Sequence, residues 1–183
     1  MSGPEPVVVL ALGSNVGDRL ANLQRAVDLL CRGEFRCTAV SGTFETAPVG
    51  GPPQDDYLNA VLLGRSGLSA AQVLSLGQAA EAALGRVRTQ RWGPRTLDVD
   101  VIAFGDQISE DPALTLPHPR AHERAFVLAP WLEADPDAVL PGRGRVADLL
   151  AVVGTAGVRR LDSATLTLPP AGQPEVAPGE ARR

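Results

Sequence analysis

The stretch Thr96-Leu97-Asp98-Val99-Asp100-Val101 alternates apolar and acidic side chains from Leu97 onward. A period of two residues predicts a β-strand with one face in the core, because successive side chains of a strand point to opposite sides of the sheet. Asp98 and Asp100 then stand side by side on the other face. This stretch therefore supplies both the clearest strand of the chain and its first candidate site.

The residues that precede this stretch complete two successive β-α-β units. Apolar runs predict the strands, and apolar residues at helical spacing predict the helices, one after the N-cap Asp18 and one after the capping box of Ser69 and Gln72. Strands are expected at residues 7–12, 37–44, 57–63 and 97–101, and helices at residues 20–30 and 70–84. This order is typical of an α+β, ferredoxin-like βαββαβ core, a mostly antiparallel sheet with both helices packed on one face.

The chain after Gly105 predicts smaller additions to that core. We expect a short strand or hairpin, a loop rich in Pro, His and Arg at residues 115–124, and helices at residues 126–133 and 146–153. Beyond residue 164 the sequence is rich in Pro and Gly and poor in large apolar residues, which is typical of disorder. The predicted organisation is a single domain over residues 1–164 and a disordered tail over residues 165–183.

The composition excludes several kinds of chemistry. All 17 basic residues are Arg, so a P-loop, a protein-kinase phosphate lysine, a pyridoxal Schiff base and a lysyl-nucleotide intermediate are absent from this chain. The net charge of −4 argues against general nucleic-acid binding. Cys31 and Cys37 have neither a CxxC nor a zinc-ribbon spacing, which favours two reduced thiols. With no secretory or membrane-spanning segment in view, we expect a cytoplasmic monomer with no membrane partner.

The acid pair predicts a metal site. Adjacent carboxylates raise each other's pKa unless a cation neutralises them. A pair of oxygen ligands suits Mg²⁺, which completes its coordination with water and substrate phosphates. The competing interpretation is the solvent face of an ordinary amphipathic strand, and on these two residues alone the two interpretations are level.

Four arginines just before the acid pair favour the metal interpretation. Arg86, Arg88, Arg91 and Arg95 fall within ten residues that contain no acid. Guanidinium groups bind phosphate oxygens and stabilise charge that develops during phosphoryl transfer. Trp92 lies among them and could stack on a planar ligand, although an aromatic anchor of the loop on the core is as common. A solvated basic loop is the alternative.

Three further features are weaker signals. Gly13-Ser14-Asn15 ends the first strand, where small residues permit close approach of a ligand. Asn59 offers an amide that can pair with the edge of a heterocycle. His118 lies beside Arg120 and Arg124, which favours a phosphate contact over a metal ligand.

Together these residues resemble one family, the 6-hydroxymethyl-7,8-dihydropterin pyrophosphokinases of folate biosynthesis. The resemblance rests first on Arg91-Trp92-Gly93-Pro94-Arg95-Thr96-Leu97-Asp98-Val99-Asp100. Shorter matches are Gly13-Ser14-Asn15, Thr46-Ala47-Pro48-Val49-Gly50, Tyr57-Leu58-Asn59-Ala60 and Pro117-His118-Pro119-Arg120 with Arg124 and Phe126. The similarity extends from about Val7 to Pro141 and leaves the tail uncovered.

The resemblance implies an activity and a set of site residues. The family transfers the diphosphate of ATP to the hydroxymethyl group of the dihydropterin and releases AMP. Asp98 and Asp100 would hold two Mg²⁺ ions, and Arg86 and Arg95 would assist transfer. The implied ATP site comprises Gln78, Glu81, Arg88, Trp92, Val101, Thr115, His118 and Arg124.

The pterin, by the same resemblance, would lie between aromatic groups on the Phe44 side and the Phe126 side. Its edge would pair with Asn59 and with the loop of Thr46, Ala47, Pro48 and Val49, and Tyr57 would lie close by. ATP and the pterin are the expected partners.

Two other functions remain as alternatives. Asp98 and Asp100 could be the metal motif of a nucleotide-sugar transferase, although the chain is short for that class and the arginine loop exceeds its needs. The chain could instead be a non-catalytic pterin- or nucleotide-binding module. A binding protein has little reason to keep like charges this close, which argues against that alternative.

Overall fold

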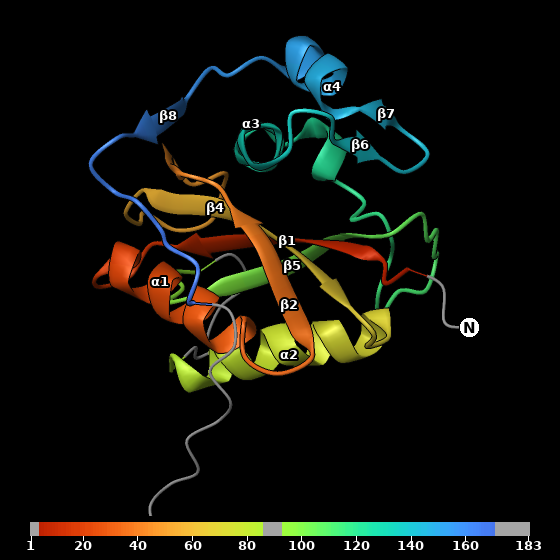
Figure 1. Cartoon of the computed structure of the whole chain (residues 1–183). Helices are drawn as coiled ribbons and strands as arrows, with labels where there is room; N and C mark the ends of the chain where they lie inside the picture. The colour runs from red at the N-terminus through yellow and green to blue at the C-terminus, as the bar shows by residue number, and fades with distance from the viewer. Residues whose placement is uncertain (1–3, 86–92, 171–183) are drawn as a thin grey trace, which may run out of the picture.

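The computed structural model describes residues 4–85 and 93–170 of the 183-residue chain, and its centre is an antiparallel sheet (Figure 1). Within the described residues this sheet has six strands in the order β5-β1-β4-β3-β8, and β2 also pairs with β4. The strands are β1 (Val7–Ser14), β2 (Phe35–Val40), β3 (Thr43–Thr46), β4 (Tyr57–Ser66), β5 (Asp98–Phe104) and β8 (Val158–Leu161). The order β5-β1-β4-β2 confirms the predicted ferredoxin-like core.

Helices cover both faces of the sheet. The helices are α1 (Arg19–Leu30), α2 (Ala70–Ala83), the 3-10 turn η1 (Ala121–Glu123), α3 (Ala125–Ala134) and α4 (Val146–Val153). A two-stranded ribbon of β6 (Val139–Leu140) and β7 (Gly144–Arg145) precedes α4. Figure 1 shows α1 and α2 below the sheet and α3 and α4 above it. We call these two sides the lower and the upper face.

The lower face carries the larger core. Leu10 and Leu12 of β1 and Leu62 of β4 meet Leu23 and Val27 of α1 there, and all are essentially inaccessible. Asp18 caps the start of α1 by accepting from Ala21, and Ser69 and Gln72 form the predicted capping box of α2. The two helices predicted at residues 20–30 and 70–84, with their N-terminal caps, are therefore confirmed.

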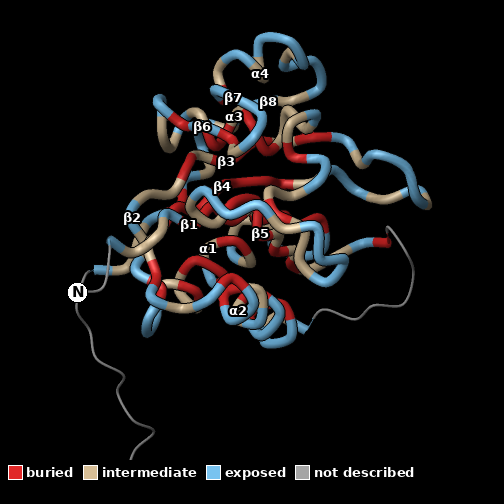
Figure 2. The backbone as a smooth tube through the Cα atoms, turned by 90° about the vertical axis from the view of Figure 1, so that its right-hand side faces the viewer, coloured by how far each residue is buried: buried red, intermediate tan, exposed pale blue. Residues whose placement is uncertain are grey.

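The upper face carries a second, smaller core under α3. Val9 of β1, Val61 of β4 and Ile102 of β5 pack there with Leu128 and Trp131 of α3. Figure 2 shows the buried segments concentrated in the central strands, whereas α4 at the top is largely exposed. Val146 is the buried residue of α4, and Val152 is 88% exposed.

The predicted boundaries of several elements need correction. Residues 37–44 form two strands, because the chain breaks at Ser41 and Gly42 between β2 and β3. Strand β8, which the sequence did not predict, extends the sheet beyond β3. The hairpin expected after Gly105 is present as a bridge between Ser109 and Leu116.

The two cysteines are bonded to each other, so the expectation of two reduced thiols is wrong. Cys31 follows the last turn of α1 and Cys37 lies on β2, and the tight connection between them brings their Cα atoms within 5.4 Å. The sequence spacing matched no known motif, and only the reversal of the chain after α1 makes the bond possible.

The start of the expected tail is also misplaced. Leu166 is buried in the lower core, and Thr167 exchanges hydrogen bonds with the Gln24 side chain of α1 at 2.8 and 3.0 Å. Residues 165–170 are therefore attached to the domain, whereas residues 171–183 lie outside the described residues. None of the described helices is long and apolar enough to cross a lipid bilayer.

Candidate active site

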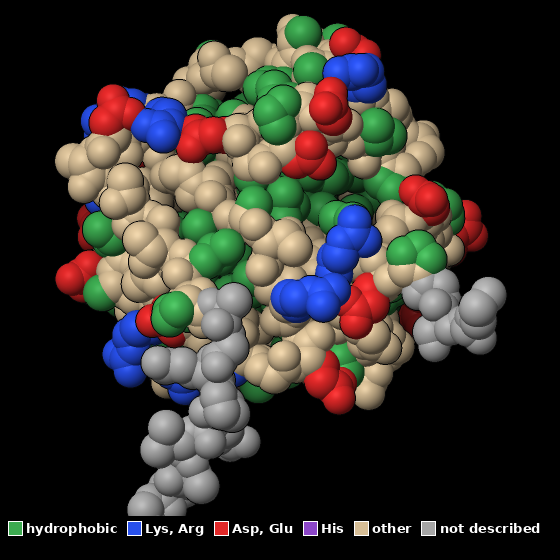
Figure 3. Space-filling model, in the orientation of Figure 1, with side chains coloured by type: hydrophobic (Ala, Val, Ile, Leu, Met, Phe, Trp, Pro, Cys, Tyr) green, Lys and Arg blue, Asp and Glu red, His purple; other side chains and the backbone are tan. Residues whose placement is uncertain are grey.

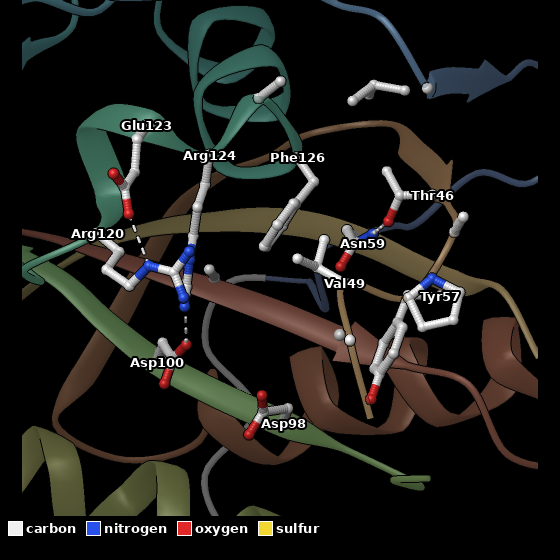
Figure 4. A pocket seen from close by; sticks show the side chains of 18 of the residues that line it. Thr46, Val49, Tyr57, Asn59, Asp98, Asp100, Arg120, Glu123, Arg124 and Phe126 are labelled. Atoms are coloured by element: carbon white, nitrogen blue, oxygen red, sulfur yellow. Dashed lines mark hydrogen bonds and ion pairs between the residues drawn. The ribbon is translucent and has the colours of Figure 1, made fainter. Parts of the chain in front are cut away.

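A cavity of about 700 Å³ opens on the upper face at the N-terminal end of α3 (Figure 4). Its floor is a row of three paired residues from adjacent strands, in which Gly13 of β1 lies between Asp98 of β5 and Asn59 of β4. Farther along the same strands, Ala11 lies between Asp100 and Val61. The upper face thus changes from apolar under α3 to polar in the cavity.

Gly13 keeps this floor open. A Cβ atom at this position would lie 3.3 Å from the Oδ1 atom of Asn59 and 3.7 Å from the Tyr57 ring. The first distance is tighter than ordinary packing and the second is an ordinary contact, so a side chain here would require the Asn59 amide to shift by a few tenths of an ångström. The glycine therefore permits a flat ligand to approach the backbone of β1.

The walls of the cavity come from four separate segments. They are the loop between β3 and β4, the loop residues around Arg95, the turn into α3, and the turn between α4 and β8. Their lining residues are Thr46, Ala47, Pro48, Val49, Gly50, Gln54, Arg95, Arg120, Glu123, Arg124, Ala125, Phe126, Val153, Gly154, Ala156, Gly157 and Val158. All seven pterin-site residues that the resemblance implies line this one cavity.

The acid pair lies on the upper face, as the alternation predicts. Val99 and Val101 point down into the lower core, and Asp98 and Asp100 point toward the cavity. Asp98 accepts a hydrogen bond from Arg95 at 2.6 Å. Burial, and then the charge of Asp98, raise the pKa of Asp100. A neighbouring carboxylate disfavours the ionised form of Asp100, and a bound cation would favour it.

Two basic side chains face Asp100 from the loop before α3. Arg124 NH1 lies 3.7 Å and His118 Nε2 lies 3.8 Å from Asp100 Oδ2. Burial lowers the pKa of His118 even though Asp100 raises it. The backbone N–H of Arg120 donates to His118 Nδ1 at 3.2 Å, so the proton of the neutral ring is on Nε2 and points to the acid pair. A phosphate at this place would meet two donors.

Asn15 connects the two sides of the site. Its Nδ2 donates to Gln54 Oε1 at 2.9 Å and to the carbonyl of Asp55 at 3.1 Å, and its Oδ1 accepts from the backbone N–H of Arg95 at 2.7 Å. The side chain is buried. The backbone N–H of Asn15 also donates to the carbonyl of Arg95 at 3.0 Å, so Asn15 links Arg95 to the loop between β3 and β4, a role that the short Gly13-Ser14-Asn15 motif did not reveal.

The aromatic groups differ from the expectation on one side. Phe126 lines the cavity as predicted, but Phe44 is not among the lining residues and is 7% exposed on the upper face. Tyr57 occupies the wall opposite Phe126 (Figure 4). Phe44 lies on β3 and pairs with Asn59 of β4, so it is one strand farther from the open floor than Asn59. For this reason it does not line the cavity.

Asn59 is held by its neighbours. Its Nδ2 donates to Thr46 Oγ1 at 2.9 Å and to the carbonyl of Phe44 at 3.3 Å. Its Oδ1 lies beside Gly13 at the cavity floor. Because both hydrogens of the amide are used within the protein, the carbonyl oxygen is the atom offered to a ligand.

The ATP-site residues are more dispersed. Arg124 lines the cavity, whereas Val101 is buried in the lower core, Gln78 is exposed on α2 and the Thr115 hydroxyl donates to the carbonyl of Asp111. Glu81 is buried on α2 and accepts from the backbone N–H of Val99 at 2.9 Å, which fixes β5 between the two acids. The expectations for Arg86, Arg88, Arg91 and Trp92 lie outside the described residues.

Comparison with known proteins identifies the family of this chain. Residues 9–136 match the family described as 7,8-dihydro-6-hydroxymethylpterin-pyrophosphokinase (HPPK). The chain belongs to this family. Two relatives named 2-amino-4-hydroxy-6-hydroxymethyldihydropteridine pyrophosphokinase support the assignment. The one from Methylorubrum extorquens is 43% identical over 84% of this chain and 97% of its own length, and the one from Mycobacterium leprae is 48% identical over 75% and 76%.

Solved structures of HPPK proteins share the fold. A crystal structure described as HPPK-DHPS in complex with substrates superposes with a TM-score of 0.67 at 9% identity, over 86% of this chain. The wild-type Plasmodium falciparum HPPK-DHPS with pterin and p-hydroxybenzoate gives a TM-score of 0.60 at 12% identity, over 83% of this chain. This HPPK chain spans about half the length of those solved chains, 47% and 42%.

Proposed function

We propose that the cavity on the upper face is the place where this HPPK brings its two substrates together. The chain is a pyrophosphokinase: it transfers the diphosphate of ATP to 6-hydroxymethyl-7,8-dihydropterin in folate biosynthesis. The observation that carries the placement is the single row of Asp98, Gly13 and Asn59. In this row Asp98 supplies a carboxylate for metal and phosphate, Gly13 leaves the floor open, and Asn59 supplies an amide for a heterocycle.

Asp98 and Asp100 would hold Mg²⁺ in this site, and we propose two ions. Carboxylate oxygens are the ligands that this cation prefers, and burial together with the charge of Asp98 raises the pKa of Asp100, which a bound cation would counteract. Among the described residues no cluster of three or more acidic, His or Cys side chains surrounds the pair, so water and phosphate oxygens would complete the coordination. When bound, the ions would neutralise phosphate charge.

Arg95, His118 and Arg124 would bind the phosphates around that acid pair. The pterin hydroxyl would attack the β-phosphorus in line and lose its proton to water as the new O–P bond forms; the bond between the β-phosphorus and the α–β bridging oxygen breaks, and AMP leaves with that oxygen. Positioning and charge stabilisation supply most of the rate in such transfers, and a covalent intermediate on the protein is not required. Arg86 would assist, and Gln78, Glu81, Arg88, Trp92, Val101 and Thr115 would lie along the ATP.

The pterin would lie on the other half of the floor. Tyr57 and Phe126 face each other across the cavity, a geometry that suits a planar ring between them (Figure 4). The carbonyl oxygen of Asn59 would accept from the pterin edge, and the loop of Thr46, Ala47, Pro48 and Val49 would close beside it.

The surface charge supports small anionic substrates over a polyanion. On the face shown in Figure 3, acidic and basic side chains are interspersed, with hydrophobic side chains between them. General nucleic-acid binders instead concentrate Lys and Arg on one face. We therefore propose that the described arginines near Asp98 and Asp100 serve ATP.

The test is an assay of the nucleotide product. Protein, ATP, Mg²⁺ and hydroxymethyl-dihydropterin are incubated together, and adenine nucleotides are separated over time. We expect AMP and the pterin diphosphate in equal amounts. Accumulation of ADP would indicate transfer of a single phosphoryl group and would contradict the proposal, and so would the absence of turnover with all components present.

A further inference from the structure

Glu45 lies at the junction of three segments that form the pterin half of the cavity. It is on β3 immediately before Thr46 and points to the lower face, away from the cavity. Its side chain is 15% exposed, and the carboxylate pairs with two arginines, Arg19 at the start of α1 and Arg159 on β8. These contacts together lower the pKa of Glu45, the hydrogen bond from Arg19 being the largest cause.

Arg19 connects the two ends of the loop that closes beside the pterin. Its NH2 donates to Glu45 at 2.9 Å, and Glu45 is the residue before that loop begins. Its NH1 donates to the carbonyl of Asp56 at 2.7 Å, and Asp56 is the last residue of the loop before Tyr57. Thr46 and Tyr57, which both line the cavity, already pair in the ladder between β3 and β4, and the guanidinium adds a side-chain link across the two ends of the loop beside that pair.

Arg159 connects the third wall to the same carboxylate. Glu45 pairs with Arg159 in the ladder between β3 and β8, and Thr46 pairs with Val158. Val158 and Gly157 line the cavity. The bond between Arg159 and Glu45 therefore holds the turn between α4 and β8 at a fixed place beside the loop.

We propose that Glu45 is a positioning residue for the pterin, although it does not touch the cavity. This inference rests on the proposed placement of the pterin. A single exposed ion pair contributes little, but this carboxylate is shared by two arginines and links α1, both ends of a loop and β8, so its loss weakens several attachments at once. The acid pair on β5 shares none of these contacts, which predicts an effect on pterin binding and not on ATP binding.

Glu133 offers a matched control. It also fastens β8, through Arg160 at 2.6 Å, but it does so on the upper face and from α3. Its other contact is the backbone N–H of Gly42 at 2.8 Å, at the far end of β3 from Thr46. Glu133→Gln therefore weakens the attachment of β8 without disturbing the ends of the loop.

The experiment compares Glu45→Gln with Glu133→Gln in the full chain. The Michaelis constants for the pterin and ATP are measured, together with the Tm and the Kd of hydroxymethyl-dihydropterin by calorimetry in the presence of a nonhydrolysable ATP analogue. We expect Glu45→Gln to raise the pterin KM and Kd about tenfold and to leave the KM of ATP within about twofold, since one charged network is lost. Glu133→Gln should lower the Tm to a similar extent and leave both Michaelis constants within about twofold.

Three results would overturn the inference. The first is a pterin Kd of Glu45→Gln within about twofold of the wild-type value. The second is an equal rise in the Michaelis constants for pterin and ATP in that variant. The third is a rise in the pterin KM of Glu133→Gln as large as that of Glu45→Gln. The double variant Arg19→Gln/Glu45→Gln supplies a second measurement. If the two residues act in one network, its loss of pterin binding free energy is smaller than the sum of the losses in the two single variants. If the wild type makes no AMP, the proposed function fails, and the calorimetric Kd values still decide the role of Glu45.

Discussion

The two faces of the sheet are built from the same strands and serve different purposes. The lower face is apolar along the whole of β1, β4 and β5 and is covered by α1 and α2. The upper face is apolar only where α3 covers it and becomes polar or open where the cavity begins. In β5 the two kinds of residue alternate, with Val99 and Val101 below and Asp98 and Asp100 above.

This difference shows how a small domain can carry an unfavourable site. Two neighbouring carboxylates and an open floor at Gly13 contribute little to folding, and the continuous lower core compensates for them. Substitutions on the lower face should therefore change stability without changing catalysis. Substitutions on the open part of the upper face should do the reverse.

The largest effect is expected for Asp98→Ala. Removal of a proposed metal ligand should reduce turnover about 10³-fold or more, because phosphate charge is no longer neutralised. The rate of AMP formation measures this, and circular dichroism should show an unchanged fold. Asp106→Ala, at an exposed position just beyond β5, should retain wild-type turnover. Unchanged turnover of Asp98→Ala would refute the assignment of the acid pair.

The complementary change on the lower face is Leu23→Ala. Leu23 is 0% exposed between α1 and the sheet, and its truncation should reduce the free energy of unfolding by about 2–5 kcal/mol. Urea titration measures the loss, and both Michaelis constants should stay within about twofold below the unfolding range. Val152→Ala on the exposed side of α4 is the control and should change stability by less than about 0.5 kcal/mol. A large change in KM for Leu23→Ala would contradict the separation of the two faces.

Asn15→Ala tests the link between the two halves of the cavity. The substitution removes three side-chain hydrogen bonds, to Gln54, Asp55 and Arg95. We expect kcat/KM for the pterin to fall about tenfold, because Arg95 and the loop lose their common anchor. Asn22→Ala, which removes an amide that contacts neither the loop nor Arg95, should change kcat/KM by less than about threefold. Equal effects of the two variants would show that Asn15 has no special role.

The smallest effect concerns the stability of the metal-free protein. Burial and Asp98 raise the pKa of Asp100, so the folded state binds its proton more tightly than the unfolded state, and the ionised carboxylate destabilises the fold at neutral pH. Asp100→Asn should raise the Tm at pH 7 in the presence of a chelator by about 2 °C while turnover is lost. This gain should shrink as the pH falls through the raised pKa, because the wild-type carboxyl becomes neutral. A lower Tm at pH 7 would mean that the contacts of Asp100 with Arg124 and His118 outweigh the repulsion.

The sequence predicted those parts of the site that depend on local pattern. The alternation in β5 was sufficient to place Asp98 and Asp100 on one face, since the side-chain period of a strand is fixed by its backbone. The motifs around Thr46, Asn59 and Phe126 marked residues that do line one cavity. The expectation placed one aromatic wall on the Phe44 side with Tyr57 close by, whereas Tyr57 lines the cavity and Phe44 does not, because Phe44 lies on β3 beyond Asn59.

The sequence alone thus determined the core order of strands and helices, the acid pair and the family, because each is encoded by residues close together in the chain. Only the tertiary structure decided that Cys31 and Cys37 are bonded, that Leu166 belongs to the core, and that β8 completes the sheet. It also decided that Asn15 and Glu45 join the walls of the site. Each of these features is a contact between residues that are far apart in the sequence or that belong to no recognisable motif. Local periodicity and short motifs therefore do not predict them.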